Sequence, residues 1–317
     1  MHEKIKSSIY GFIIGDILGV PVEFYKRSYL KENPITDMVN NKHRGTTIGF
    51  YSDDSAMTLC TMKGIIDNPN VFDSRLHKSI MDNYILWVKD GYMSANNRCF
   101  GIGGTTFESL NKYRKSKSLD DYCEINIESE RKAGNGALMR ILPLVLALYN
   151  KNMTINDKLS IIEFNNNLTH NNRDSRCSCV FYTLFIFNLL DTNDLNSAYD
   201  LSIKGINEYY KDNIANKLDK ILSKKILNLN EEDISSSGYV IDTLEACLWC
   251  LFNTDNYKNS VLKAVNLGND ADTIAAITGS ISGLYYGIND IPKKWIDKII
   301  NKEMIDDLLD KYIKVVD

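Results

Sequence analysis

The stretch Gly268-Asn-Asp-Ala-Asp-Thr273 runs directly into the apolar segment Ile274-Ala-Ala-Ile-Thr-Gly-Ser-Ile-Ser-Gly-Leu284. This second segment is built from small and apolar residues and predicts a helix. Asp270, Asp272 and the hydroxyl of Thr273 lie where that helix begins. One acid is enough to cap the free N–H groups and to meet the positive end of the helix dipole. Taken alone, the stretch is most simply a cap, but it carries one acid more than a cap needs.

A second acidic helix start occurs far upstream, in Tyr51-Ser-Asp-Asp-Ser-Ala-Met57. Here Ser52, Asp53 and Asp54 precede an apolar helix that we expect to reach about Ile66. Carboxylates and hydroxyls without nearby Cys or His ligands suit hard cations such as Mg²⁺, Mn²⁺ or Ca²⁺. Two cations are easier to justify than one, because four carboxylates around a single small site would repel each other strongly. Sequence distance alone does not show that the two starts meet.

Composition describes an ordinary globular protein of 317 residues, 44% hydrophobic and 25% charged, with a formal net charge of −4. The absence of excess positive charge argues against nucleic acid as the main partner. The first ten residues carry charges of both signs, and Asp16 interrupts the apolar stretch that follows. We therefore expect no signal peptide, no membrane association, a cytoplasmic location and a monomer.

The cysteines are seven, an odd number, and most of them lie in apolar periodic stretches. Cys247 and Cys250 have the CxxC spacing but stand alone in a helical segment. This context favours buried free thiols over a zinc or redox site.

Most apolar segments repeat with the helical period of 3.6, and no strand–helix alternation is present. The first helix, 3–19, carries Gly11, Gly15 and Gly19 every four residues. Glycine disfavours a helix interior, so this ridge predicts the close approach of another backbone. Asp16 lies within this ridge. The sequence supports two roles for it equally: capping a helix, or a hydrogen bond to the residues that carry the proposed metal ligands. The remaining expected helices are 51–66, 74–90, 106–113, 138–149, 155–168, 175–190, two within 195–230, one around Cys247, and two from Ile291 onward. Residues 257–267 lead to the opening stretch. Residues 26–50 read as a long loop and 115–131 as a charged surface segment. We predict an all-α protein with one domain, 1–317.

Two glycine turns precede helices, Cys99-Phe-Gly-Ile-Gly-Gly-Thr-Thr106 and Ala133-Gly-Asn-Gly136. Exposed backbone N–H groups at a helix start can bind an anion, although most glycine clusters are simply turns. His170 lies in a polar break, where a surface histidine is an equally good interpretation.

In these motifs the chain resembles the ADP-ribosylglycohydrolases, a family related to the dinitrogenase-reductase-activating glycohydrolase of nitrogen-fixing bacteria. The matching motifs stand in the family's order and cover about residues 5–295. They are Gly11-x3-Gly15-Asp16-x2-Gly19-x-Pro21-x-Glu23-Phe24, Tyr51-Ser-Asp-Asp-Ser-Ala-Met57, Phe100-Gly-Ile-Gly-Gly-Thr-Thr106, Gly134-Asn-Gly-Ala-Leu-Met-Arg140, Thr169-His170, Gly238-Tyr-Val-Ile-Asp-Thr-Leu244 and Gly268-Asn-Asp-Ala-Asp-Thr273.

The resemblance implies an all-α, orthogonal multi-helix bundle with a central cleft that holds two Mg²⁺ ions, or Mn²⁺ in their place. The implied metal ligands are Ser52, Asp53, Asp54, Asp270, Asp272 and Thr273. The implied substrate-binding residues are Gly101, Gly103, Gly104 and Thr105 for the diphosphate, Asn135 and Gly136 for the ribose next to the metals, His170 for the ribose–phosphate portion, and Tyr239 for the adenosine end. Glu23 matches an acid that contacts a metal or the substrate ribose.

The implied reaction is hydrolysis of the bond between ribose C1 and a modified protein side chain, with ADP-ribose as product. Arginine is the leading linkage. The catalytic acids are expected among Asp53, Asp54 and Glu23, with Asp54 or Glu23 accepting a proton from water. One alternative is a hydrolase of another linkage: serine, nucleic acid or a free ADP-ribosyl compound. Another is a non-catalytic ADP-ribose reader or a crystallin-like member, against which the clustered acids argue.

The sequence also departs from the family pattern. Gly101 stands where many arginine-specific members carry Asp, which bears on the linkage. Ser52 and Ser55 stand where many relatives have Thr, and Asn269 replaces a frequent Gly. We expect these three changes to preserve metal binding.

Overall fold

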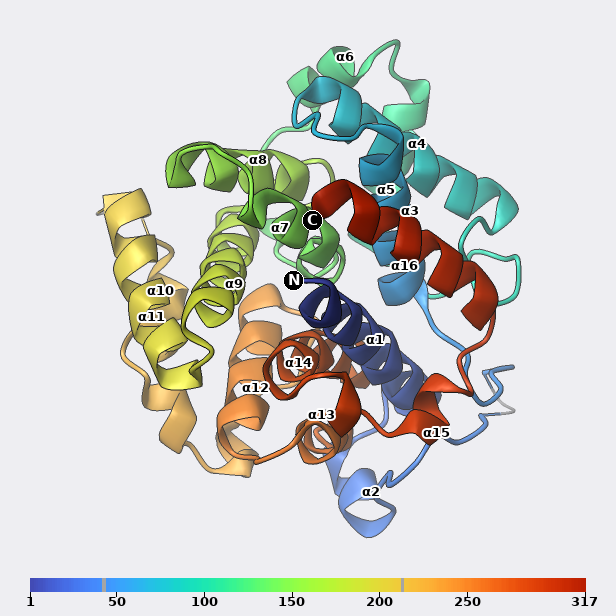
Figure 1. Ribbon diagram of the computed structural model, residues 1–317, viewed down its shortest axis with the longest axis vertical. Coiled ribbons are helices and arrows are strands. Elements are labelled where there is room, and N and C mark those ends of the chain that lie inside the picture. The colour runs from blue at the N-terminus through green and yellow to red at the C-terminus, as the bar shows by residue number, and fades with distance from the viewer. Residues whose placement is uncertain (42–43, 212–213) are drawn as a thin grey trace.

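A computed structural model describes residues 1–41, 44–211 and 214–317. These residues form α-helices and short 3-10 turns without a β-strand, which confirms the all-α prediction (Figure 1). The α-helices are α1 (His2–Gly19), α2 (Arg27–Glu32), α3 (Asp53–Asp67), α4 (Ser74–Asp90), α5 (Gly104–Lys115), α6 (Leu119–Ile125), α7 (Leu142–Tyr149), α8 (Ile155–Asn167), α9 (Arg173–Thr192), α10 (Leu195–Tyr210), α11 (Asp219–Leu222), α12 (Val240–Phe252), α13 (Tyr257–Asn266), α14 (Ala271–Tyr286), α15 (Lys293–Ile296) and α16 (Lys302–Val316).

The centre of the fold is the crossing of α1 and α14, the first helix and the helix of the opening stretch (Figure 1). A Cβ added to Gly11 would lie 2.2 Å from the carbonyl oxygen of Gly279. One on Gly15 would lie 2.1 Å from the carbonyl oxygen of Ala275. The glycine ridge on α1 therefore meets the small residues of α14 backbone to backbone, as predicted.

This crossing also fixes the position of the acidic start of α14. A Cβ on Gly19 would lie 2.3 Å from the Cα of Asp272, so the end of α1 touches the first turn of α14. One helical turn earlier on α1, Asp16 is fully buried and accepts hydrogen bonds from the start of α3. The two acidic helix starts are thus assembled around one end of α1.

Residues 2–22 are long and apolar enough to cross a membrane by length and composition, and 94% of the window is buried inside the fold. Asp16 interrupts this segment, so it is not one continuous apolar run. Its hydropathy reflects its place in the core, since Ile5, Ile9, Ile13 and Leu18 are fully buried.

Two short helices were missed in segments expected to be irregular. Leu30 anchors α2 within the predicted loop 26–50, and Leu119 with Tyr122 anchors α6 within 115–131. One or two buried side chains are too few to give a helical period in the sequence. Residues 42–43 of the predicted loop lie outside the described residues.

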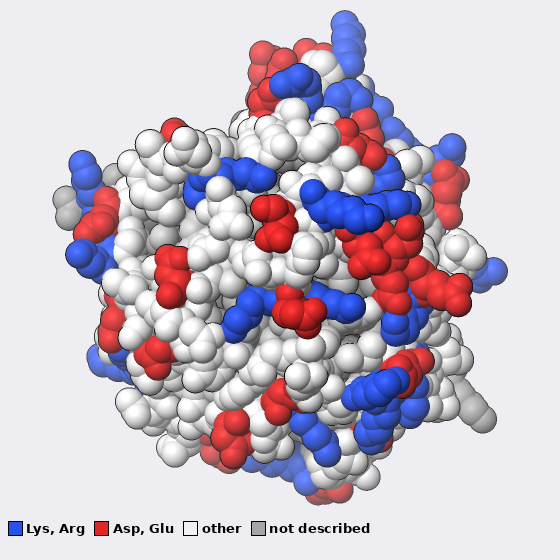
Figure 2. All heavy atoms as spheres, in the orientation of Figure 1, with Lys and Arg blue, Asp and Glu red and all other residues white. Residues whose placement is uncertain are grey.

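All seven cysteines are free, and Cys247 and Cys250 are buried in α12, as expected for core thiols. Cys123 is exposed, contrary to the expectation of burial. On the face seen in Figure 2, Lys and Arg side chains alternate with Asp and Glu, and no broad basic surface is visible.

Candidate active site

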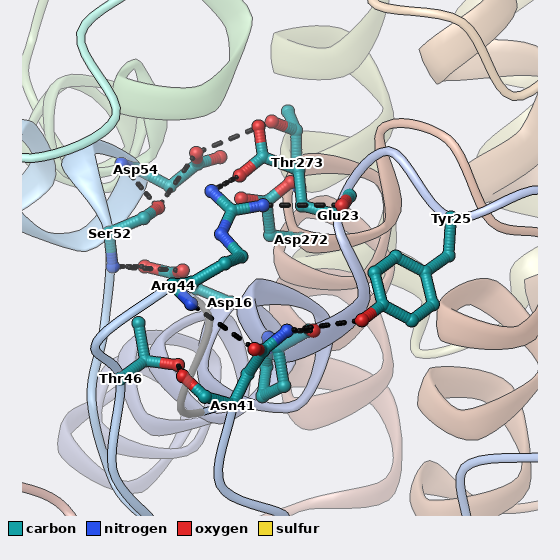
Figure 3. A network of polar contacts seen from close by, with 11 residues as sticks. Asp16, Glu23, Tyr25, Asn41, Arg44, Thr46, Ser52, Asp54, Asp272 and Thr273 are labelled. Carbon is teal, nitrogen blue, oxygen red and sulfur yellow. Dashed lines mark hydrogen bonds and ion pairs between the residues drawn. The ribbon is translucent and has the colours of Figure 1, made fainter.

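The two acidic helix starts, which the sequence could not place relative to one another, meet directly. The hydroxyl of Thr273, at the start of α14, donates to Oδ2 of Asp54, at the start of α3, over 3.3 Å. Figure 3 shows this contact between residues 219 positions apart in the chain. The acids of both helix starts therefore belong to one site.

The start of α3 is held by two polar side chains. Ser52 is the N-cap residue: its hydroxyl accepts from the N–H of Asp54 and donates to the Asp54 carboxylate, both over 3.2 Å. Asp16, from α1, accepts from the N–H groups of Ser52 and Ser55 and from the Ser55 hydroxyl. Asp16 thus caps α3 from another helix and orients the residues that carry the site, so both of its proposed roles apply.

The start of α14 is held by a turn in the left-handed region, Gly268 at φ 73° and Asn269 at φ 54°. Asparagine is one of the few non-glycine residues that adopts this conformation readily, which explains why Asn replaces Gly here. The N–H of Asp270 donates to the carbonyl of Ser236 over 3.0 Å, and the side-chain amide of Asn135 donates to its carboxylate. Asn135 therefore orients the acid instead of only facing the pocket.

Burial dominates the electrostatics of the cluster. It raises the pKa of Asp16 and of Asp270 to about 6, and it raises the pKa values of Asp53, Asp54 and Asp272 well above the ordinary range. Repulsion between the neighbouring carboxylates adds to these three shifts. A structural core would not concentrate acids in this way, because each resists ionisation.

The donor set fits hard cations. Single carboxylate oxygens of Glu23, Asp270 and Asp272 lie within 4.8 Å of one another. Oδ1 of Asp54 is buried and has no hydrogen-bond partner, a costly state for a polar atom unless something binds it. Converging carboxylate oxygens, with an unsatisfied buried oxygen on the same pocket wall, are a donor set that suits Mg²⁺ or Mn²⁺.

These acids line a pocket of about 250 Å³. The predicted residues on its wall are Glu23, Asp53, Asp54, Gly101, Gly103, Gly104, Thr105, Asn135, Gly136, His170, Asp270, Asp272 and Thr273. A larger groove of about 800 Å³ lies elsewhere, between the residues of α3, α4 and α16, and contains none of these acids. The clustered acids therefore identify the smaller pocket as the candidate active site.

The glycines of the first turn differ in what constrains them. A Cβ on Gly103 or Gly104 would meet no atom within 4 Å, and neither residue has a positive φ. Packing therefore does not require glycine at either position. A set of open backbone N–H groups that binds an anion at the start of α5 would require it. Gly101 is constrained: its φ is +84° and a Cβ would lie 2.3 Å from Oδ1 of Asp53. The Asp found here in many relatives would clash with the Asp53 carboxylate in this arrangement.

His170 is buried beneath the second glycine turn. A Cβ on Gly136 would lie 2.7 Å from its ring, and the Thr169 hydroxyl lies 2.7 Å from Nδ1. Burial, followed by the positive charge of Arg140, lowers the pKa of His170 to about 3. The ring is therefore neutral at physiological pH, and the surface-histidine alternative is wrong.

Two predicted residues stand apart from the pocket wall. The Tyr239 hydroxyl donates to Asp174 over 2.6 Å, and the Tyr239 backbone pairs with Gly134. Ser52 is buried behind Asp54 and faces that carboxylate. Both support residues on the wall.

Two further neighbours of the site, Arg44 and Phe24, were assigned no role from the sequence, although Phe24 ends the first matching motif. Arg44 forms an ion pair with Glu23. Phe24 lines the pocket although 74% of its surface is exposed. Arg44 lies in a polar segment without periodicity, so the local sequence does not indicate where in the fold this residue lies.

The all-α fold and the acid-lined pocket with its glycine turns are the features that the resemblance implies for a hydrolase of ADP-ribose linkages. The family model of ADP-ribosylglycohydrolase matches residues 1–317, and the chain belongs to that family. It is 32% identical to an ADP-ribosylarginine hydrolase of Serratia proteamaculans, over 98% of this chain and 78% of that protein. It is 25% identical to the ADP-ribosyl-[dinitrogen reductase] glycohydrolase of Rhodospirillum rubrum, over 94% and 91%. A solved structure of an ADP-ribosylglycohydrolase-related protein complex superposes with a TM-score of 0.79 at 25% identity, covering 100% of this chain and 99% of that one.

Proposed function

We propose that this enzyme removes ADP-ribose from modified arginine side chains of proteins in a reaction that depends on two Mg²⁺ ions. The observation that carries the proposal is the convergence of the acids of α3 and α14, joined by the Thr273–Asp54 hydrogen bond. The arginine linkage is supported by the similarity to the Serratia proteamaculans ADP-ribosylarginine hydrolase.

The residues of the pocket wall proposed to hold the metals are Asp53, Asp54, Asp270, Asp272 and Thr273, with Glu23 within reach of Asp270 and Asp272. Ser52, the remaining predicted ligand, would join them only by turning its hydroxyl from the Asp54 carboxylate toward the pocket. Bound Mg²⁺ would supply a positive charge that fixes the ribose hydroxyls and lowers the pKa of a coordinated water.

The protein groups position the substrate around C1 of the ribose. N–H groups at the start of α5, near Gly103 and Gly104, suit a diphosphate. The neutral ring of His170 can exchange hydrogen bonds with the ribose–phosphate portion without repelling or attracting its charge. Carboxylates on the pocket wall stabilise the positive charge that develops on the ribose ring. We propose that Asp54 or Glu23 takes the proton of the attacking water.

The linkage is tested by an assay of ADP-ribose release from arginine-, serine- and nucleic-acid-linked substrates, each with Mg²⁺ and with EDTA. We expect the fastest release from arginine and none in EDTA. Faster release from another linkage would favour the alternative hydrolase. Gly101 raises this alternative, because it stands where many arginine-specific members carry Asp and has no room for that side chain. Tight ADP-ribose binding with no release from any substrate would identify a reader.

Stability should depend on Mg²⁺ in a pH-dependent manner. The raised carboxyl pKa values mean that, without metal, these acids contribute stability that is present below pH of about 4 and lost as pH rises through their folded values, about 6 for Asp16 and Asp270. Mg²⁺ binds only the ionised acids. We therefore expect Mg²⁺ to raise the thermal midpoint more at pH 7.5 than at pH 5.5. At pH 7.5 and a concentration 100 times the Kd, one bound ion should add about 2.7 kcal/mol to the free energy of unfolding.

The measurement is the difference in thermal midpoint with and without Mg²⁺ at each pH, with Na⁺ at equal ionic strength as the control. Taking the difference removes the opposing contribution of the buried His77 and His170, whose lowered pKa values affect both samples. An equal Mg²⁺ effect at both pH values would contradict the assignment of the acids as ligands.

A further inference from the structure

Arg44 occupies a position shaped for a guanidinium group. It forms an ion pair with the Glu23 carboxylate and donates to the Glu23 carbonyl over 3.2 Å. Its guanidinium carbon lies 5.4 Å from the ring centre of Phe24 and 5.5 Å from that of Phe100. Figure 3 shows the guanidinium pointing toward Glu23, on the side of the site where Asp272 and Thr273 lie. One carboxylate and two aromatic rings thus surround one planar cation.

Phe24 is unusual in both conformation and exposure. Its φ is +67°, a strained value for a bulky residue, and its N–H donates to the carbonyl of Asn269 over 2.6 Å. The residue is 74% exposed and lines the pocket. An aromatic side chain held at a strained position on a pocket wall, with little packing of its own, is typical of a ligand contact. Phe100 is fixed from behind by an edge-on contact with Phe50, with ring centres 5.0 Å apart.

We propose that Glu23, Phe24 and Phe100 form a guanidinium-binding box that receives the arginine side chain of the substrate, and that Arg44 fills the box until the substrate arrives. This inference rests on the proposed function and names the residues that recognise its linkage. Guanidinium groups pair with carboxylates through two parallel donors and stack on aromatic faces, which the box offers together. Glu23 also borders Asp270 and Asp272, two of the proposed metal ligands, so the box adjoins the proposed metal site. With Glu23 paired to the guanidinium, Asp54 is the acid left to take the proton of the attacking water.

The box would discriminate between linkages. Only 11% of the Glu23 side chain is exposed, so a substrate that displaces Arg44 must itself pair with this carboxylate. A neutral serine linkage cannot replace Arg44 at this carboxylate, so displacing Arg44 would leave Glu23 without a partner. Sites built for a hydrogen-bonding group reject analogues that lack it. Arginine selectivity then comes from Glu23 and the two rings, and does not need an Asp at position 101.

The first experiment measures binding of methylguanidinium to the Mg²⁺-loaded protein by calorimetry, with methylammonium as a cation of equal charge. Arg44→Gln should tighten methylguanidinium binding about tenfold or more, the result expected when an internal competitor fills more than nine-tenths of the sites. Arg75→Gln is the matched control, because Arg75 is an exposed arginine paired with Asp73 on α4. Equal binding of the two cations, or no response to Arg44→Gln, would overturn the box.

The second experiment separates the aromatic contribution from bulk. Phe24→Leu keeps an apolar side chain but removes the π face, and Phe24→Trp keeps that face. We expect Phe24→Leu to weaken methylguanidinium binding about two- to fivefold, the size of one exposed cation–π contact, and to raise KM for arginine-linked substrate with kcat retained. Phe24→Trp should bind as tightly as the wild type. Identical behaviour of the Leu and Trp variants would remove the aromatic part of the proposal.

The two proposals fail separately. If arginine-linked ADP-ribose is not hydrolysed but methylguanidinium binding responds to Arg44 and Phe24, the proposed linkage is wrong and the box stands as a cation site. If arginine-linked ADP-ribose is hydrolysed while neither substitution changes guanidinium binding or KM, the box is wrong and the function stands.

Discussion

The double variant Asp53→Asn, Asp272→Asn is expected to lose Mg²⁺-dependent release of ADP-ribose by at least about 1,000-fold. One residue of the pair lies in the first turn of α3 and the other in the first turn of α14, so the variant removes a proposed ligand from each helix. Loss of a supporting residue around a metal typically costs about 10- to 100-fold, and two direct ligands should cost more. The measurement is kcat/KM with Mg²⁺ against the residual rate in EDTA.

Asp67→Asn is the matched control, because Asp67 lies on the same α3 but pairs with Lys63 at the exposed end of the helix. It should leave the rate unchanged. At pH 7 without metal, the double variant should be at least as stable as the wild type, since asparagine does not resist burial as an ionised carboxylate does. A wild-type rate that is unaffected by EDTA would refute the metal proposal, and so would a double variant that keeps its rate.

The sequence predicted those parts of the site that have their own local pattern. Asp53, Asp54, Asp270 and Asp272 stand at helix starts, where extra acids are conspicuous, and a helix start presents its first side chains at a defined place. The glycine spacing on α1 predicted a close backbone contact, since glycine at every fourth position of a helix has few other uses. The structure supplied the partner, α14, and with it the reason that the two acidic starts meet.

The remaining features depend on contacts between distant segments and leave no mark in the local pattern. Arg44 reaches Glu23 from a segment without periodicity, and Gly101 is constrained by the Asp53 carboxylate only because α3 lies beside it. Tyr239 is assigned to the adenosine end by its position in a motif, and its hydroxyl donates to Asp174, 65 positions away, a contact that the sequence does not indicate. Motif position identifies a neighbourhood, whereas the direction of a side chain follows from its packing.

Gly15→Ala is expected to destabilise the protein by about 3 kcal/mol or more, although the same change in most helices is favourable. In a solvent-exposed helix interior, alanine is preferred over glycine by about 1 kcal/mol. Here the new methyl group would lie 2.1 Å from the carbonyl oxygen of Ala275, 2.4 Å from its carbonyl carbon and 2.7 Å from the nitrogen of Ala276. All three are backbone atoms and cannot rotate away, so α1 and α14 must separate, and overpacking of this kind costs about 1–3 kcal/mol or more.

The measurement for Gly15→Ala is urea unfolding, where the midpoint should fall with little change in the slope m. Gly104→Ala provides the matched control for stability, because a Cβ there meets no atom within 4 Å and its backbone is ordinary helix. It should unfold at or above the wild-type midpoint. The separation of α1 from α14 should also displace the start of α14 from Asp54, so Mg²⁺ should stabilise Gly15→Ala less than it stabilises the wild type. If Gly15→Ala matches Gly104→Ala in stability, α1 does not cross α14 at backbone contact, and the account of how the crossing assembles the acidic site fails with it.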